Sequence, residues 1–329
     1  MITRRRVVIA LGAGAVLSRV SAAPPAGKTV HLGVVENLRD RFDPGTVPIH
    51  RALVEGLQTY GLEIGRNLVL EYRSTGGQPA KLDDIAAELV RLNVDAIVSI
   101  ASAPMAALQR ATKSIPIVMV GVSDPLESGL IASLARPGGN ITGLANNASE
   151  LSAKRVQLLK DTVPGLSTAA VLWNSSLKSM EIQFQKVVLA APIIGVKILS
   201  IRIAGSDNFD QAFEEIRKAR PGGMIVLFGP LRGNDLPRIV DFVRSNRIPT
   251  IFEGTQGVRG GGLMEFSANF EEMARRAGYY LDKIVNGASP ADLPVQEPTE
   301  FHITVNLKAA REMGLNIPAS VLTRADLVE

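Results

Sequence analysis

Short apolar runs alternate with segments of helical periodicity along this chain, and the alternation occurs as two consecutive sets. The runs are rich in valine and isoleucine, which is typical of strands buried on both faces of a sheet. Strands separated by single helices imply right-handed crossovers and therefore a parallel sheet. The predicted fold class is α/β, with two lobes that each contain a doubly wound parallel sheet. We expect strands at 30–35, 68–72, 95–100 and 116–120 in the first lobe, and at 169–173, 196–201, 224–228 and 249–252 in the second.

The segments between these runs carry apolar residues at helical spacing. Leu82, Ile85, Ala86 and Leu89 recur at i, i+3, i+4 and i+7 and would share one helix face. Another segment, 48–60, has the same kind of spacing and stops at a glycine. Further helices are expected at 104–111, 150–161, 209–218, 236–245 and 271–286, and a last strand at 301–305 is followed by a last helix at 307–313.

The segment 134–144, with the sequence LARPGGNITGL, separates the two sets. Its first two residues, Leu134 and Ala135, are expected to end a helix. Pro137 fixes φ and the glycines after it permit positive φ, so the segment should form a sharp turn. The extended run that begins at Ile141 is then expected to carry the chain from the first lobe to the second.

Length and composition agree with two lobes and exclude several classes of function. The 329 residues exceed the usual size of one compact core. The net charge is +4, but Lys and Arg are scattered singly, so no nucleic-acid partner is predicted. The chain has no cysteine, which excludes disulfides, thiolate metal sites and cysteine nucleophiles. The three histidines are far apart in sequence, and we predict neither a metal nor a cofactor.

The N-terminal residues 1–22 have the pattern of a signal peptide. Arg4, Arg5 and Arg6 precede an apolar stretch, 7–17, which is too short for a stable membrane anchor. Small residues follow, ending at Ala22. The pattern fits a twin-arginine signal or a general secretory signal, and either predicts an exported, periplasmic protein.

The residues that follow the expected strands are small and polar, whereas the strands are apolar. In open parallel sheets, ligands bind outside the carboxyl ends of the strands. We therefore predict a ligand site at the strand ends of both lobes, formed by Glu36, Asn37, Ser102, Ala103, Ser123, Asp124, Asn174, Ser175, Gly229, Pro230 and Glu253.

The charges in this set suggest the chemistry of the ligand. Ser102 could cap the next helix, whose N–H groups and dipole would bind a carboxylate or phosphate. Asp124 and Glu253 could hold an ammonium, so the two charges together suggest an amino acid. Local alternatives exist: Ser102 and Ser123 could be simple caps worth about 1 kcal/mol each, and Asp124 precedes Pro125 as in many turns.

No catalytic motif occupies these loops. The sequence has no GxSxG motif, no P-loop and no histidine beside a serine of the set. An alternative function remains, in which Asp124 and Glu253 act as the acid and base carboxylates of an exported hydrolase.

Several segments resemble one family. They include 134–143, 116–118, Asp124-Pro125, 280–284, 290–294 and 324–326, together with Gly56-Leu57 and 65–67. Over the region from Val30 to the end, the chain resembles the periplasmic substrate-binding proteins of ABC transporters, specifically the group linked to aromatic and other amino acids.

This resemblance implies a type I binding fold, with two lobes joined by three crossing strands and a cleft at the hinge. The crossings are expected at 141–146, near Ser267 and near Pro298. Lobe one would comprise 28–145 with 268–298, and lobe two 146–267 with 299–329. Ser267 joins the predicted ligand-binding residues because it lies at the second crossing.

The implied mechanism is ligand-driven hinge closure, followed by recognition of the closed form by a membrane permease. A monomeric, non-enzymatic protein is expected. The segment 264–267 reads Met-Glu-Phe-Ser where relatives usually carry Met-Ser-Tyr-Gly. The added charge of Glu265 leaves the identity of the ligand undetermined. Amino acids are favoured over a short peptide, an aromatic acid or a sugar. Trp173 either supports the pocket or fills the core.

Overall fold

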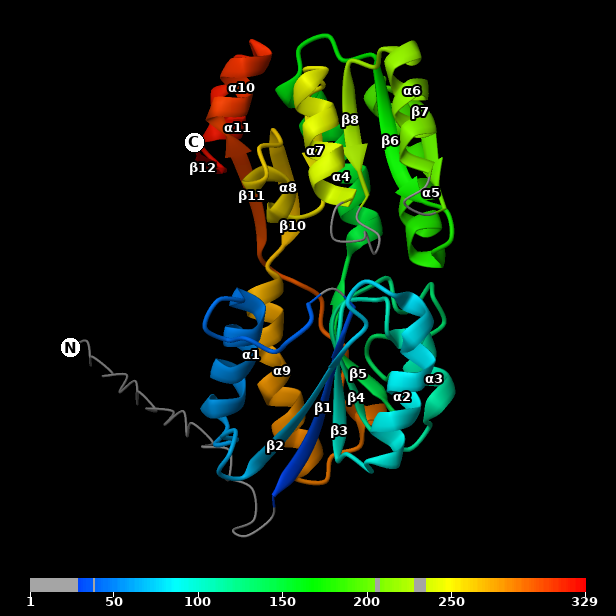
Figure 1. Ribbon diagram of the computed structural model, residues 1–329, viewed down its shortest axis with the longest axis vertical. Coiled ribbons are helices and arrows are strands. Elements are labelled where there is room, and N and C mark those ends of the chain that lie inside the picture. Colours follow the sequence, from blue (N-terminus) through cyan, green and yellow to red (C-terminus); the bar gives the residue numbers. More distant parts are fainter. Residues whose placement is uncertain (1–28, 38, 205–207, 228–234) are drawn as a thin grey trace, which may run out of the picture.

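The chain folds into two lobes stacked along the long axis of the molecule (Figure 1). The structure is a computed structural model that describes residues 29–37, 39–204, 208–227 and 235–329. Each lobe is built around one sheet, and the predicted α/β class with two parallel-sheet lobes is confirmed. No helix in these described ranges is long and apolar enough to cross a membrane.

Lobe one contains a five-stranded sheet in the order β2-β1-β3-β4-β5, and all of its strand pairs are parallel. The central strands are buried on both faces, which is why their sequences are continuous apolar runs. The strands are β1 (Val30–Glu36), β2 (Leu68–Ser74), β3 (Ala96–Ile100), β4 (Ile117–Ser123) and β5 (Ile141–Asn146).

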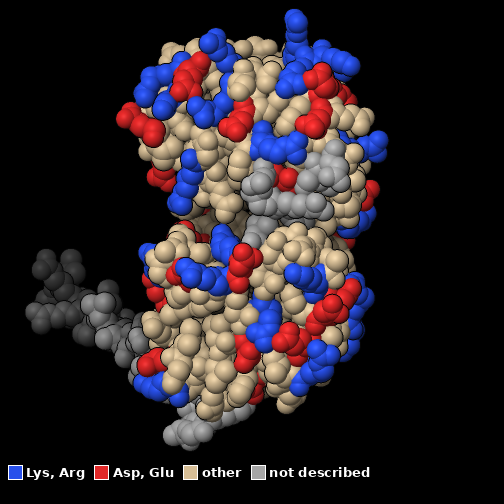
Figure 2. Space-filling view, viewed as in Figure 1, with Lys and Arg blue, Asp and Glu red and all other residues tan. Residues whose placement is uncertain are grey.

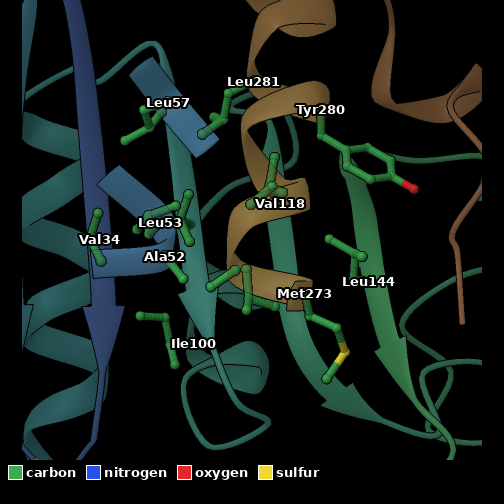
Figure 3. Packing of buried hydrophobic residues seen from close by; sticks show 14 of the residues in the cluster. Val34, Ala52, Leu53, Leu57, Ile100, Val118, Leu144, Met273, Tyr280 and Leu281 are labelled. Atoms are coloured by element: carbon green, nitrogen blue, oxygen red, sulfur yellow. The ribbon is translucent and has the colours of Figure 1, made fainter. Parts of the chain in front are cut away.

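Four helices cover this sheet: α1 (Pro48–Thr59), α2 (Leu82–Arg91), α3 (Met105–Ala111) and α9 (Phe270–Val285). The helices α1 and α9 bury their apolar stripes against one face, and Figure 3 shows their residues interleaved with those of the strands. The helices α2 and α3 cover the other face. Thus α9, from late in the chain, completes the core of lobe one.

The helices α1 and α9 touch through two glycines. A Cβ atom on Gly56 would lie 2.0 Å from the Arg275 carbonyl oxygen, and one on Gly278 would lie 2.2 Å from the Gly56 carbonyl oxygen. Any side chain at either position would therefore push the helices apart.

Lobe two contains a seven-stranded sheet in the order β12-β11-β10-β9-β8-β6-β7. Only the pair β10 and β11 is antiparallel among the described strand pairs of this sheet. The strands are β6 (Thr168–Asn174), β7 (Lys197–Ile203), β8 (Gly223–Val226), β9 (Thr250–Phe252), β10 (Met264–Ala268), β11 (Phe301–Asn306) and β12 (Asp326–Val328).

Helices cover both faces of this second sheet as well. One face packs against α4 (Ala148–Thr162), α5 (Lys178–Ile194), α10 (Leu307–Met313) and α11 (Ala319–Leu322). The other face packs against α6 (Phe209–Ala219) and α7 (Asp235–Ser245). A short helix, α8 (Thr255–Arg259), follows β9. Trp173 is buried in the first of these cores and stacks on Phe184 at a centroid distance of 4.6 Å.

The chain passes between the lobes three times (Figure 1). It leaves lobe one after β5, returns between β10 and α9, and leaves again before β11. The segment before the third passage lies beside the end of β5, because the Ala145 N–H donates to the Gln296 carbonyl oxygen at 2.9 Å. We call these passages the first, second and third crossing.

Two expectations around the segment 134–144 are corrected. No helix ends at Leu134-Ala135, because residues 124–140 form turns and bends. Leu134 and Ile131 instead pack against the core under α2 and α3, so their apolar character reflects burial rather than helical periodicity. The run 141–146 is the edge strand β5, paired with β4 throughout, and the crossing begins only after it.

Candidate ligand-binding site

The strands of both lobes end at the waist of the molecule, where Figure 2 shows a hollow between the lobes. The carboxyl ends of β1, β3 and β4 therefore approach those of β6 and β9. Of the predicted site residues, Gly229 and Pro230 lie outside the described residues. The others fall at these strand ends or at the second crossing, and their contacts differ widely.

Glu36, at the end of β1, is buried and its carboxylate is surrounded by donors. Arg39 Nη1 donates to Oε2 at 3.0 Å, His50 Nε2 lies 3.2 Å from Oε1, and the Tyr72 hydroxyl donates to Oε1. Burial alone would raise the pKa of Glu36, but the contacts with His50 and Tyr72 and the charge of Arg39 hold it below its usual value. The carboxylate thus organises the segment that leads to α1.

Asn37 is also buried, but only one of its two polar side-chain atoms is hydrogen-bonded within the described residues. Its Oδ1 accepts a hydrogen bond from Thr75 Oγ1 at 2.5 Å. Its Nδ2 has no hydrogen-bond partner within the described residues. A buried amide donor at a strand end is suited to a polar group of a ligand, because buried donors need partners.

Ser102 and Ser123 connect the ends of β3 and β4. The Ser123 N–H donates to Ser102 Oγ at 2.9 Å. The prediction that Ser102 caps the next helix is wrong, because α3 begins at Met105 with Pro104 at its N-cap position. The hydroxyl of Ser102 is used instead to join two strand-end loops. Ala103, in the same loop, is partly exposed.

Asp124 lies just beyond β4 in a left-handed backbone conformation, with φ of 45°. Its Oδ1 accepts hydrogen bonds from Ser149, at 2.6 Å from Oγ and 3.4 Å from the backbone N–H. Its Oδ2 is buried and has no partner among the described residues. Burial raises the pKa of Asp124 to about 6, against the opposing effect of the Ser149 hydrogen bond.

The predicted residues after β6 are used in local turns. Asn174 Oδ1 accepts hydrogen bonds from the Ser176 N–H at 3.0 Å and from the Ser176 hydroxyl at 2.7 Å. Ser175 is exposed, and its N–H donates to the Ile203 carbonyl oxygen. These contacts match the turn-forming role that Asn commonly has, and they leave the amide nitrogen of Asn174 as its remaining polar group.

Arg155 of α4 is a buried charge that sequence reasoning missed. Its side chain is completely buried, its Nε donates to the Phe266 carbonyl oxygen at 2.9 Å, and its Nη1 donates to Ser152 Oγ at 3.0 Å. Nη1 also lies 3.9 Å from Glu253 Oε1. A signal existed in the sequence: Arg155 follows Leu151 by four residues and therefore shares its inward helix face.

Glu265 lies near this arginine and is completely buried. Its Oε1 accepts a hydrogen bond from Thr304 Oγ1 at 2.8 Å, while Oε2 has no partner in the described part of the chain. Burial raises the pKa of Glu265, although the charge of Arg155 opposes the shift. Arg155, Glu253 and Glu265 together form a buried charge cluster beside Ser267 and the second crossing, which we call the hinge cluster.

The arrangement offers groups for the recognition of a polar ligand. Its members are buried hydrogen-bond donors in lobe one and a mixed charge cluster in lobe two. Across the described ranges, no group of His, Asp and Glu has the spacing of a metal site. Both ring nitrogens of the buried His50 face structural partners, because Nδ1 accepts from the Asp43 N–H at 3.0 Å and Nε2 lies 3.2 Å from Glu36 Oε1. His50 is therefore not arranged as the general base of a serine–histidine pair.

Comparison with known proteins decides between the two functional interpretations. Residues 43–329 match the family described as ABC transporter substrate binding protein. The chain belongs to this family. A tyrosine-binding protein from Clostridioides difficile (strain R20291) is 27% identical over 259 residues, which cover 78% of this chain and 73% of that protein.

Solved structures agree with this assignment. A conserved domain protein from Vibrio cholerae has a TM-score of 0.83 at 26% identity, covering 92% of this chain and 100% of that one. An ABC domain in complex with L-Trp from Streptococcus pneumonia has a TM-score of 0.83 at 24% identity over the same shares. A ligand-free, open substrate-binding protein with adhesive properties from Clostridium difficile has a TM-score of 0.69 at 25% identity, covering 92% and 99%.

The resemblance stated from the sequence is therefore confirmed, and so is the solute-binding role that it implies. The family works in transport, which supports solute binding and not the hydrolase alternative built on Asp124 and Glu253. A small-molecule ligand and a membrane permease are the partners that membership implies. Substrate-binding proteins of this kind are typically extracytoplasmic. The individual ligand contacts stay predictions.

Proposed function

We propose that this protein captures an amino acid between its lobes and delivers it, as a monomer and without catalysis, to an ABC permease. One observation carries the proposal: buried polar groups lie unpartnered within the described residues on both sides of the waist. They include Asn37 Nδ2 in lobe one and Arg155 Nη2 with Glu265 Oε2 in lobe two. A zwitterion supplies both donors and acceptors for such groups.

The charges suggest how the ligand is oriented. Glu253 and Glu265 place two carboxyl groups beside Arg155 in the hinge cluster, and we assign the ammonium group of the ligand to this side of the waist. The loops joined by Ser102 and Ser123, with the Asn37 amide, offer donors to a carboxylate. The tyrosine-binding relative and the L-Trp complex support an amino acid, and an aromatic one first. Asn174, Ser175, Gly229, Pro230 and Ser267 complete the proposed contacts.

Closure of the lobes is the proposed mechanism. Residues 28–145 with 268–298 would move as one unit, and residues 146–267 with 299–329 as the other. A ligand that touches both units favours the closed state, because only that state makes both sets of contacts. The higher TM-score with the L-Trp complex than with the ligand-free, open structure supports a lobe arrangement nearer to the former.

The test is a thermal-shift screen of the protein against the amino acids, followed by calorimetry. A true ligand at about 100 times its dissociation constant adds about 2.7 kcal/mol of stability. Glu253→Gln should weaken binding of that ligand, whereas Glu214→Gln, at an exposed glutamate of the same lobe, should not. Binding of no amino acid, or a ligand recovered chemically altered, would overturn the proposal.

The proposed function also includes export of the protein to the periplasm. The signal-like residues 1–22 lie outside the described residues, and their pattern is the support for a periplasmic location and for a twin-arginine or general route. N-terminal sequencing of protein recovered from the periplasm should give a first residue near Ala23. Retention of the full chain in the cytoplasm would contradict this location.

A further inference from the structure

The helix α4 begins lobe two, yet its N-terminus is capped by a residue of lobe one. Its own N-cap residue, Asn147, makes no side-chain capping bond. The carboxylate of Asp124, beyond β4, accepts hydrogen bonds from both the hydroxyl and the backbone N–H of Ser149 in the first turn. A carboxylate at this position also interacts favourably with the helix dipole. The contact therefore spans the hinge beside the first crossing.

A groove of about 570 Å³ surrounds this contact and is bordered by both lobes. Lobe one contributes the segment 124–127, the crossings contribute Asn147 and Glu297, and lobe two contributes the first turn of α4 and one face of α5. The charged groups that face Asp124 from these elements are Glu127, Glu150, Lys186 and Glu297. Because its walls belong to different lobes, the groove must change shape when the lobes rotate.

The Asp124–Ser149 contact is well placed to set the angle between the lobes. A hydroxyl-to-carboxylate hydrogen bond tolerates only a few tenths of an ångström before it weakens. The Asp124 N–H also donates to the Asn146 carbonyl oxygen at 3.3 Å, which fixes Asp124 against the end of β5. A small rotation of α4 about the first crossing would therefore break the bond to Ser149.

We propose that Asp124 and Ser149 form a hinge latch, a positioning pair that favours the lobe arrangement of this structure, the closed one of the proposed function, and so raises ligand affinity. Asp124 takes this positioning role in place of the ammonium contact that the sequence suggested for it. This rests on the proposed function, because it assumes a ligand that binds the closed state. Losing the latch lowers the closed population, and the apparent affinity falls by the same factor. We expect a loss of about 5- to 20-fold, which is the lower part of the range of a typical allosteric coupling.

The chain contains a matched control within lobe one. Asp43 accepts hydrogen bonds from the Gly45 N–H at 3.0 Å, the Thr46 N–H at 3.2 Å and Thr46 Oγ1 at 2.8 Å. This is the same carboxylate-to-hydroxyl chemistry ahead of a helix, but it crosses no hinge. Thr46→Ala therefore removes a comparable bond and should leave lobe closure unchanged.

The experiment compares the wild type with Ser149→Ala, Asp124→Ala, the double variant and Thr46→Ala. Calorimetry with L-tyrosine and L-tryptophan measures affinity, and circular dichroism shows that each variant is folded. Both latch variants should lose about 5- to 20-fold in affinity, the double variant no more than either alone, and Thr46→Ala less than about twofold. Wild-type affinity in folded Ser149→Ala protein would overturn the latch.

Spin labels report the hinge directly and separate this proposal from the proposed function. The chain has no cysteine, so Asp83→Cys in lobe one and Asp210→Cys in lobe two would carry the only labels. Without ligand, Ser149→Ala should shift the distance distribution towards longer values and Thr46→Ala should not. If neither amino acid binds the wild type, the proposed function fails while this shift still supports the latch. Unchanged distances in Ser149→Ala would overturn it.

Discussion

Two buried glutamates, Glu36 in lobe one and Glu265 in lobe two, lie at opposite sides of the waist in opposite electrostatic settings. Glu36 accepts hydrogen bonds from Arg39 and Tyr72, its Oε1 lies 3.2 Å from His50 Nε2, and its pKa is lowered. Glu265 receives a hydrogen bond from Thr304, keeps one oxygen unpartnered in the described structure, and its pKa is raised. The first carboxylate is satisfied by the fold alone, whereas the second is left under-satisfied where a ligand is expected. Burial of a carboxylate therefore does not by itself indicate a binding site.

The largest effect on stability is expected from removing Arg155, the cation of the hinge cluster beside Glu265. Arg155→Ala would remove a buried positive charge beside Glu265 and Glu253 and would empty the space of a large side chain. Removing one partner of a buried ionic group typically costs about 3–5 kcal/mol, and we expect a loss of unfolding free energy in this range. Urea unfolding measures it. Arg275→Ala, which removes an exposed and paired arginine, should cost less than about 1 kcal/mol.

A pH series extends the comparison to another buried carboxyl, that of Asp124. Its pKa is about 6 in the folded chain and near 3.8 when exposed, so the folded state holds its proton more tightly. This group therefore lowers the unfolding free energy as the pH rises from about 4 to 6, by about 3 kcal/mol at most. Asp124→Asn should remove that slope. Parallel pH profiles of wild type and variant, measured by urea unfolding, would contradict the assignment.

Glu36→Gln is expected to cost about 2 kcal/mol, because hydrogen bonds to a charged group contribute about 1.5–3 kcal/mol. The lowered pKa gives the direction of the pH effect: the stabilisation is present above the unfolded-state pKa and is lost as the pH falls through the folded-state pKa. Thermal unfolding at neutral and acidic pH measures both. A cost that stays constant down to acidic pH would argue against a charged Glu36.

The smallest change in unfolding free energy is expected from Glu265→Gln. This variant is the counterpart in lobe two of Glu36→Gln in lobe one. Burial already disfavours the charged form of Glu265, so replacing it by a neutral isostere should change the unfolding free energy by less than about 1 kcal/mol. Binding of the ligand should weaken more than stability. If Glu265→Gln destabilises the chain as much as Glu36→Gln, the distinction between the two carboxylates fails.

The sequence predicted the architecture well, because strand runs and helix periodicity are local signals. The valine-rich run at 30–35 and the spacing of Leu82 to Leu89 each identified an element within one or two residues of its observed bounds. Topology then placed the strand-end loops together. Individual side-chain partners could not be predicted, because they come from distant parts of the chain. Asp124 bonds to a residue 25 positions away, and Arg155 to one 111 positions away.

The same limit explains the two errors at single residues. Ser102 precedes a helix, and serine there usually caps it, but the bond from Ser123 across 21 positions takes the hydroxyl instead. Leu134 looked like part of a helix because it is apolar, but its burial comes from the core beneath α2 and α3. In both cases a long-range contact overrode a sound local preference.

The tight glycine contact between α1 and α9 has a consequence for how the protein is made. The helix α9 begins at Phe270, so the face of the first sheet that carries Val34 and Val118 is covered by α1 alone until all of β6 to β10 has been synthesised. The N-terminal lobe thus cannot finish folding as the nascent chain emerges, although N-terminal domains generally fold first during translation. A nascent chain of this kind would present apolar surface to chaperones for most of its synthesis, and its two halves should reach their final state together.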